Sequence, residues 1–273
     1  MKTLYVTDLD GTLLNSRDRL SLFTVKAING LIDRGLCFSY ATARSLSSAS
    51  VVTAGLATEM PVAVYNGAFI RNPKTGTVLS AIGFAADEKN DVMRFLKGTG
   101  IFPLVYAFVD GLERVSWLAG SEDEGMLHYL RLRNGDRRLR SVPDISDLYD
   151  GEAFYFTCIG SRSELLPVYE RFRCDARYTC TLQQELYREE YWCEIMPRKA
   201  TKANAVRLLK EILQCDRVVT FGDAINDIPM FAASDECYAV SNAVDELKGV
   251  ATSIIKSNDE DGVAHWLEDH FSE

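Results

Sequence analysis

The sequence predicts an α/β protein with a doubly wound, Rossmann-like parallel sheet, into which a second domain of α+β character is inserted. In residues 1–83, and again in 191–273, short apolar runs alternate with amphipathic helical patterns. This alternation is typical of a parallel sheet with helices on both faces. Residues 84–190 have a different pattern, with strands that pair as neighbours, and this segment is long enough to be a domain.

The first outer segment begins with a buried strand at residues 3–7. Ser21 is the expected N-cap of a helix that extends to Arg34, and Gly35 ends this helix. The elements that we expect next are a strand at 36–41, a helix near 46–57, a strand at 62–65, a short extended run at 68–70 after the Asn66-Gly67 turn, and a turn at 72–76.

The inserted segment predicts an antiparallel sheet with helices. Its expected elements are a helix at 87–98, strands at 103–109 and 112–118, a helix at 122–133, a strand at 153–160, a helix at 163–173 and a strand at 176–182. Asp110-Gly111 fits a two-residue hairpin turn between two of these strands.

After residue 191 we expect the first pattern to resume. The predicted elements are a strand at 192–196, an amphipathic helix at 201–213, a buried strand at 217–221, and then a helix, a strand and a helix up to the C-terminus.

Composition limits the classes of partner. The 273 residues carry 39 acidic and 30 basic side chains, a net charge of −9. This balance argues against a general nucleic-acid binder, although one site can still be locally positive and take a small anion. The seven cysteines are odd in number and lack Cys-x-x-Cys spacing, which predicts reduced thiols in a cytoplasmic protein. No apolar run has the length of a signal peptide or membrane span. The oligomeric state cannot be predicted.

Polar side chains follow several of the predicted strands at their carboxyl ends. Ligands of a doubly wound sheet bind beyond these ends, so we expect four segments that are far apart in the sequence to converge. They are Asp8/Asp10 after the first strand, Thr42/Arg44 after the second, Lys202 at the start of a helix, and Gly222-Asp223-Ala224-Ile225-Asn226-Asp227 after Phe221.

The first of these segments predicts phosphorus chemistry. Asp8 and Asp10 point the same way from a strand end, because side chains alternate along a strand. Asp8 would attack phosphorus and become an aspartyl phosphate, while Asp10 would protonate the leaving oxygen and then deprotonate the hydrolytic water. Gly11 and Thr12 let the backbone turn sharply beside an anion.

Two further residues are suited to a phosphoryl group. Thr42 offers a hydroxyl, and Lys202 offers a compact positive charge to the same group and to Asp8. Lys199 is an alternative to Lys202, but Lys202 is preferred because it follows a plausible N-cap, Thr201.

The last segment predicts a metal site. Asp223 and Asp227 add carboxylates for Mg²⁺, which prefers a few protein oxygens together with water and phosphate. Asn226 would orient one of those ligands. Together with Lys202, a metal would neutralise charge where the transition state of phosphoryl transfer needs it.

These segments resemble the four motifs of the haloacid dehalogenase superfamily, and within it the chain resembles the Cof-type phosphatases. Asn66-Gly67-Ala68 and Asp259-Glu260-Asp261-Gly262-Val263-Ala264 are also similar to that subfamily. The resemblance implies a Mg²⁺-dependent phosphatase with a core at 1–83 and 191–273. It also implies that 84–190 form the large α/β cap, inserted between the second and third motifs, which sets substrate specificity.

The resemblance also implies roles for single residues. The metal ligands would be Asp8, Asp10 through its backbone carbonyl, and Asp223, with Asp227 at the supporting acidic position. The expected substrate-binding residues are Leu9, Thr42, Ala43, Arg44, Asn66, Lys202 and Asn226.

Some assignments stay open at this point. Arg44 is equally a substrate contact or one half of a structural ion pair, and Asn66 is equally a site residue or a turn former. Ala43 and Ala203 stand where the family usually has glycine, and a positive φ at either position would cost about 1 kcal/mol.

The first functional hypothesis is a Mg²⁺-dependent phosphomonoester hydrolase that acts on a small phosphorylated metabolite, such as a sugar phosphate. The second is a phosphosugar mutase, similar to a known phosphomannomutase family, which would return the phosphoryl group to a second hydroxyl of the substrate. The third is a non-catalytic protein that binds phosphorylated metabolites, which the intact Asp8/Asp10 pair disfavours.

Overall fold

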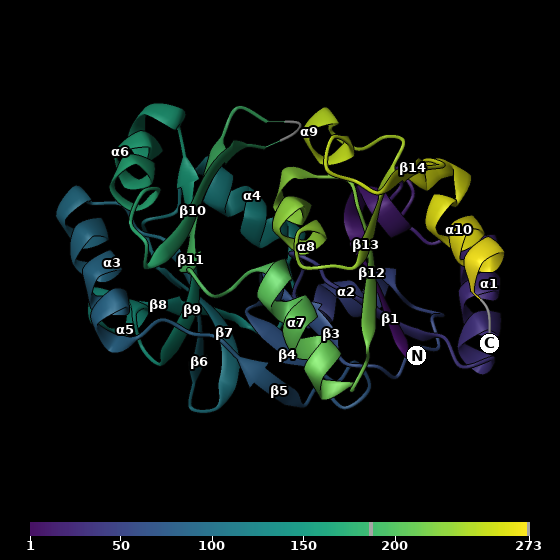
Figure 1. Cartoon of the computed structure of the whole chain (residues 1–273). Helices are drawn as coiled ribbons and strands as arrows, with labels where there is room; N and C mark the ends of the chain where they lie inside the picture. Colours follow the sequence, from purple (N-terminus) through teal and green to yellow (C-terminus); the bar gives the residue numbers. More distant parts are fainter. Residues whose placement is uncertain (186–187, 272–273) are drawn as a thin grey trace. The chain divides into compact units, whose positions relative to one another are not determined.

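The computed structural model describes residues 1–185 and 188–271, which divide into two compact units (Figure 1). The first unit combines Met1–Ala81 with Ala200–Glu273, and the second is Ile82–Lys199. Among the residues that the structure describes, no helix combines the length and the apolar character needed to cross a membrane.

The first unit contains a five-stranded parallel sheet with the order β14-β13-β12-β1-β2. Its strands are β1 (Thr3–Thr7), β2 (Cys37–Tyr40), β12 (Arg217–Gly222), β13 (Glu236–Val240) and β14 (Ser253–Ile255). Its helices are α1 (Leu22–Asp33), α2 (Leu46–Val52), α7 (Lys202–Ile212), α8 (Ile228–Phe231), α9 (Asp245–Lys248) and α10 (Gly262–His270).

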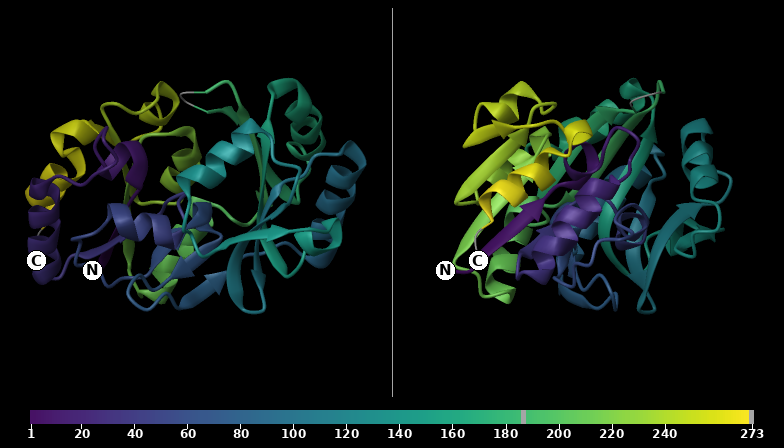
Figure 2. Two further views of the ribbon diagram at one scale, coloured as in Figure 1. Left: turned by 180° about the vertical axis from the view of Figure 1, so that it is seen from behind. Right: turned by 90° about the vertical axis from the view of Figure 1, so that its right-hand side faces the viewer.

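Helices lie on both faces of this sheet, which confirms the predicted fold class. Helices α1 and α10 lie side by side on one face, while α7 and α8 cover the other (Figures 1 and 2). The central strands are fully buried, with Leu4, Val6 and Phe221 at 0% exposure. Burial on both faces explains why these strands have continuous apolar sequences without alternation.

The start of α1 and the start of α7 follow the predicted capping. The Ser21 hydroxyl accepts a hydrogen bond from the Thr24 N–H at 2.9 Å. The Thr201 hydroxyl accepts one from the Asn204 N–H at 3.2 Å, so that Lys202 is the first residue of α7. Helix α2 ends at Val52, earlier than the predicted residue 57.

The third predicted strand differs from a regular member of the parallel sheet. Strand β3 (Val62–Val64) has a single parallel bridge beside β2, between Ala41 and Ala63. It pairs antiparallel with β4 (Phe69–Arg71), and β4 pairs with β5 (Val78–Ala81), a strand that the sequence did not indicate. The Asn66-Gly67 turn therefore reverses the chain into a small antiparallel sheet.

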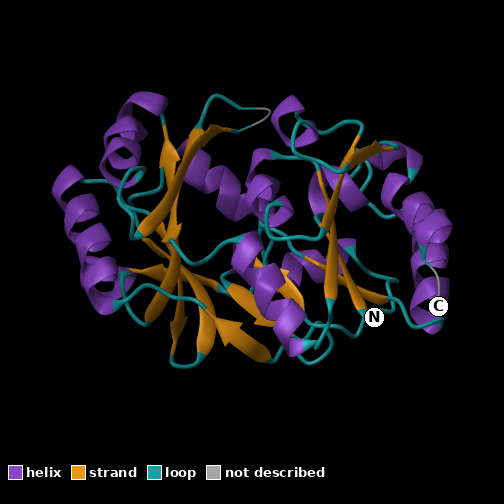
Figure 3. Ribbon diagram, viewed as in Figure 1, coloured by secondary structure: helices purple, strands orange, loops and turns teal. Residues whose placement is uncertain are grey.

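The second unit is an α+β structure, and its helices and strands are distinguished by colour in Figure 3. Its six-stranded sheet has the order β10-β11-β9-β6-β7-β8. Its strands are β6 (Leu104–Val109), β7 (Leu112–Leu118), β8 (Leu139–Val142), β9 (Glu152–Gly160), β10 (Tyr178–Gln184) and β11 (Tyr191–Pro197). Its helices are α3 (Ala86–Thr99), α4 (Glu124–Leu132), α5 (Ile145–Leu148) and α6 (Arg162–Phe172).

The hairpin predicted at Asp110-Gly111 is confirmed. These two residues have φ of 51° and 75°, and they join Val109 to its partner Leu112 across the ladder. Positive φ at both turn positions is what a type I′ hairpin turn requires. The core of the unit lies where α3 and α6 pack on the sheet, and includes Val92, Leu96 and Phe172.

The structure of this region differs from the expected one in the pairing of its strands. The strand predicted at 192–196 does not return to the core sheet, because β11 pairs antiparallel with both β9 and β10. The compact-unit division accordingly falls between Lys199 and Ala200 instead of at residue 191. The sheet is also mixed, since β7 and β8 run parallel, and neither β8 nor α5 was predicted.

Candidate active site

Asp8 lies at the carboxyl end of β1, between β2 and β12 in the sheet. Its side chain is 7% exposed. One oxygen, Oδ1, accepts a hydrogen bond from the Leu9 N–H at 2.7 Å and forms an ion pair with Lys202 Nζ at 2.8 Å. Asp8 also caps the wide π-type turn Leu9–Leu13, in which Gly11 has φ of 73°. The carboxylate is therefore held in one orientation at the mouth of the sheet.

Lys202 connects two loops through buried ion pairs. Its Nζ lies 2.8 Å from Asp8 Oδ1 and 2.8 Å from Asp227 Oδ1, with 1% of the side chain exposed. Burial alone would lower the pKa of this ammonium group, but the two carboxylates outweigh burial and raise it. Lys202 is therefore a permanent cation in the site. The alternative lysine, Lys199, belongs to the second unit.

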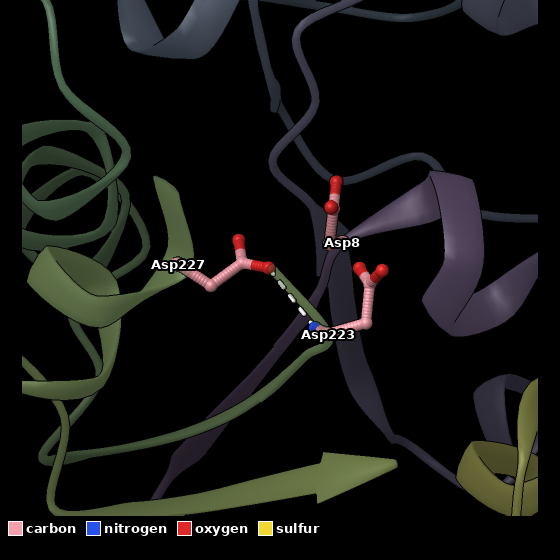
Figure 4. A group of neighbouring side chains, drawn as sticks. All are labelled: Asp8, Asp223 and Asp227. Carbon is pink, nitrogen blue, oxygen red and sulfur yellow. Dashed lines mark hydrogen bonds between the residues drawn. The ribbon is translucent and has the colours of Figure 1, made fainter. Parts of the chain in front are cut away.

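Asp227 is fully buried and uses both of its oxygens within the protein. Oδ1 accepts from Lys202, while Oδ2 accepts from the N–H groups of Asp223 and Ala224, each at 3.1 Å. Figure 4 shows the hydrogen bond to the Asp223 N–H. Asp227 thus fixes the loop after β12 and the ammonium group of Lys202 at the same time.

The three carboxylates of Asp8, Asp223 and Asp227 converge, and each offers an oxygen within 4.8 Å of the others (Figure 4). Burial raises the pKa of Asp8, opposed by Lys202 and reinforced by Asp227. Burial also raises the pKa of Asp223, to about 6, although the Thr12 hydroxyl donates to its Oδ1 at 2.9 Å. One lysine does not compensate three carboxylates, and the hard oxygen donors of Asp8 and Asp223 suit a divalent cation such as Mg²⁺.

A cavity of about 310 Å³ opens beside these carboxylates, and it lies entirely within the first unit. Its lining residues are Asp8, Asp10, Gly11, Ala43, Lys202, Asp223, Ala224 and Asn226. The predicted convergence of segments from four parts of the chain is therefore present in the geometry.

Thr42 and Ala43 follow β2 after a single intervening residue, Ala41. The Thr42 side chain is completely buried, and its Oγ1 accepts a hydrogen bond from the Arg44 N–H at 3.1 Å. This contact leaves the hydroxyl proton for another acceptor. Neither Ala43 nor Ala203 has a positive φ, so neither position carries the backbone cost that glycine would avoid.

Asn66 and Asn226 lie close to each other, with Asn226 Nδ2 3.5 Å from Asn66 Oδ1. Tyr65 and Asn66 have φ of 52° and 54°, a left-handed conformation that non-glycine residues seldom adopt. Gly67 fits against α7 so tightly that a Cβ atom there would lie 2.4 Å from the Thr201 carbonyl oxygen. The strained turn is therefore fitted to the start of the helix that carries Lys202.

The structure places Leu9 and Arg44 differently from the other expected substrate-binding residues. The Leu9 side chain is fully buried in the core, and its N–H is used by Asp8. The Arg44 guanidinium forms an ion pair with Asp10, the second of the two alternatives considered for this residue.

Two residues that the sequence patterns missed support the loop after Asp8. Asn242 Nδ2 donates to the Gly11 carbonyl oxygen at 2.7 Å, and Asn258 Nδ2 donates to the Leu14 carbonyl oxygen at 2.9 Å. Asn258 immediately precedes the segment 259–264 that resembles the Cof-type phosphatases. No sequence signal distinguishes Asn242 from an ordinary surface residue.

The fold and the site together define an α/β protein with a cluster of carboxylates at the carboxyl ends of its parallel strands. A buried lysine contacts two of these carboxylates. A family model described as haloacid dehalogenase-like hydrolase matches residues 5–267. The chain belongs to this family, and within it to the Cof-type phosphatases.

Relatives extend over the whole length of the chain. The 5-amino-6-(5-phospho-D-ribitylamino)uracil phosphatase YwtE of Bacillus subtilis is 25% identical, over 96% of this chain and 95% of its own. The HMP-PP phosphatase of Serratia proteamaculans is 24% identical, over 98% and 95%. The crystal structure of TM0651 from Thermotoga maritima has a TM-score of 0.80 and 25% identity, and covers 100% of this chain and 99% of its own.

Proposed function

We propose that this phosphatase is a Mg²⁺-dependent phosphomonoester hydrolase that works through an aspartyl phosphate on Asp8. The observation that carries the proposal is the buried contact of Asp8 with Lys202 at 2.8 Å, beside a second acidic residue, Asp223. A carboxylate held by one oxygen keeps the other available as a nucleophile, and the ammonium group offers positive charge to an incoming phosphoryl group.

The remaining residues have definite tasks in this proposal. Asp10 gives a proton to the leaving oxygen and then takes one from the water that hydrolyses the intermediate. Thr42 donates its hydroxyl proton to a phosphoryl oxygen, and Lys202 neutralises charge on the same group. Asp227 positions Lys202 and the loop that bears Asp223, because both of its oxygens are already used.

The donor set of the site fits Mg²⁺, which would be held by the carboxylates of Asp8 and Asp223 and by the backbone carbonyl of Asp10. When bound, the ion supplies charge neutralisation to the phosphoryl group that is transferred. We do not assign Asp227 as a direct ligand, which refines the set expected from the sequence.

The substrate that we propose is a small phosphorylated metabolite. The Bacillus subtilis relative is named for a phosphorylated ribitylamino derivative of uracil, and the Serratia proteamaculans relative is named for HMP-PP. We propose that the second unit, Ile82–Lys199, is the cap that recognises the part of the substrate other than the phosphate.

Release of inorganic phosphate from a panel of sugar, polyol and pyrimidine phosphates, with Mg²⁺ and with EDTA, tests this function. We expect metal-dependent release from at least one compound. If the panel yields an isomerised sugar phosphate without free phosphate, the protein is a mutase. If compounds bind without any turnover, the hydrolase proposal is wrong.

Replacing Gly11 with alanine is expected to weaken the metal site. A Cβ atom at this position would lie 2.3 Å from Asp223 Oδ2, so the carboxylate must move. We expect the Mg²⁺ concentration for half-maximal activity to rise by about tenfold, the equivalent of ~1.4 kcal/mol. Gly76→Ala is the matched control, because its φ of 71° is similar but nothing lies within 4 Å. Equal Mg²⁺ requirements in the two variants would contradict the prediction.

Asp223→Asn is expected to stabilise the metal-free protein while it weakens the response to Mg²⁺. The pKa of Asp223 in the folded protein, about 6, is above the ordinary value. The folded state therefore holds this proton more tightly than the unfolded state, and wild-type stability falls as pH rises through about 6. The asparagine does not titrate, so the gain in melting temperature in EDTA should be larger at pH 8 than at pH 5.

Thermal unfolding at both pH values, with and without Mg²⁺, checks this expectation. Wild-type protein should gain stability from Mg²⁺ at pH 8, because ligands that bind the folded state stabilise it. The melting temperatures of Asp223→Asn and wild type could instead differ by the same amount at pH 5 and pH 8. That result would show that ionisation of Asp223 does not destabilise the folded protein.

A further inference from the structure

Asp10 follows the strand end on an open turn that does not by itself fix the side chain. Its backbone, with φ of −69° and ψ of 126°, is not helical although it lies inside the turn Leu9–Leu13. Its side chain is 44% exposed. An exposed carboxylate populates several rotamers unless a partner selects one. The group proposed to move protons therefore needs an external support.

Arg44 supplies that support through its guanidinium group. Nε donates to both carboxylate oxygens of Asp10, at 3.0 and 2.9 Å, and Nη2 donates to Oδ1 at 2.5 Å. A planar guanidinium that contacts both oxygens fixes the direction as well as the position of a carboxylate. Lysine at this position could provide the charge but not this geometry.

Arg44 is itself held by its neighbours. Its N–H donates to Thr42 Oγ1 at 3.1 Å, its carbonyl oxygen accepts from the Tyr65 N–H at 2.9 Å, and Nη1 donates to Ser48 Oγ at 3.3 Å. Only 22% of its side chain is exposed. A fixed connection therefore runs from the buried Thr42, through Arg44, to the carboxylate of Asp10.

We propose that Arg44 is the positioning residue of Asp10, and that it directs this carboxylate for proton transfer instead of binding the substrate. This inference rests on the proposed function, in which Asp10 protonates the leaving oxygen. Two donor groups of Arg44, Nε and Nη2, are already directed at Asp10, which argues against a phosphate contact through them.

The test varies how much the leaving group needs a proton. When the phosphoryl group is transferred, p-nitrophenyl phosphate releases p-nitrophenolate, a stable anion, whereas benzyl phosphate releases a strongly basic alkoxide unless the leaving oxygen is protonated. We expect Arg44→Met to lower kcat/KM for benzyl phosphate by about 100-fold, the lower range of general acid catalysis, and for p-nitrophenyl phosphate by less than about fivefold. Arg44→Lys should give an intermediate loss for benzyl phosphate. Arg207, exposed on α7, offers the control Arg207→Met, which should change neither value.

A double-mutant cycle separates positioning from a general structural role. Arg44→Met in an Asp10→Asn background should lower kcat/KM for benzyl phosphate no further, because the group that it positions is already lost. Equal losses for the two substrates in Arg44→Met, or additive effects in the double variant, would overturn the inference. Asp8→Asn in the same assay tests the proposed function separately. Activity retained in this variant would show that Asp8 is not the nucleophile, whereas the role of Arg44 is judged from the two substrates and the double variant.

Discussion

Asp8→Asn is expected to abolish turnover while the protein remains folded. The carboxamide that replaces Asp8 is a poor nucleophile toward phosphorus, so we expect kcat to fall by about 10⁴-fold or more. Stability should be retained, because Lys202 keeps its contact with Asp227 at 2.8 Å and the Leu9 N–H can still donate to an amide oxygen. Phosphate release, with circular dichroism and thermal unfolding, measures both effects.

The matched comparison for this variant is Asp33→Asn. Asp33 is an exposed carboxylate at the end of α1, and it is outside the cavity beside Asp8. We expect its activity to stay within about twofold of wild type, as for most surface substitutions. More than about 1% of wild-type activity in Asp8→Asn would rule out Asp8 as the nucleophile.

Lys202→Met is expected to cause the largest loss of stability in the first unit. Methionine fills similar space but leaves the buried carboxylates of Asp8 and Asp227 without their shared cation. Removal of one partner from a buried ion pair costs about 3–5 kcal/mol, which corresponds to a decrease in melting temperature of roughly 10 °C. Activity should be lost as well, because the phosphoryl group loses its fixed positive charge.

Two further variants test the cause of that loss. Lys202→Met combined with Asp227→Asn should recover part of the stability without recovering activity, because one uncompensated charge is removed. Lys210→Met, at a partly exposed lysine 3.6 Å from Asp235, should change stability by less than about 0.5 kcal/mol. If both lysine variants lose the same amount of stability, the buried ion pairs of Lys202 with Asp8 and Asp227 do not stabilise the protein.

The segments of the candidate site could be predicted to converge because a simple topological rule connects them. Asp8, Thr42 and Asp223 follow strands that pair in parallel, β1, β2 and β12, so their carboxyl ends lie at one edge of the sheet. The N-cap at Thr201 likewise located Lys202 at the start of its helix. These inferences needed only strand order and capping, both of which leave local signals in a sequence.

Other features leave no local signal. Strand β11 has the same apolar pattern whether it joins the parallel core or the mixed sheet of the second unit, so its partners were assigned wrongly. The contact of Arg44 with Asp10 depends on the direction of two loop side chains. Asn242 supports Gly11 through a single hydrogen bond across 231 residues of chain. Such contacts follow from the tertiary fold and not from residue type or spacing.

To test whether catalysis proceeds through an aspartyl phosphate, we would locate the phosphoryl group on the protein during turnover. We would use Asp10→Asn with p-nitrophenyl phosphate, because this substrate needs no acid to leave, whereas the intermediate still needs a base for its hydrolysis. After acid quenching within milliseconds, mass spectrometry of the N-terminal peptide should show one added phosphoryl group on Asp8, with a stoichiometric burst of p-nitrophenolate. A phosphoryl group on a different residue, or steady turnover with neither burst nor labelled peptide, would contradict the aspartyl phosphate mechanism.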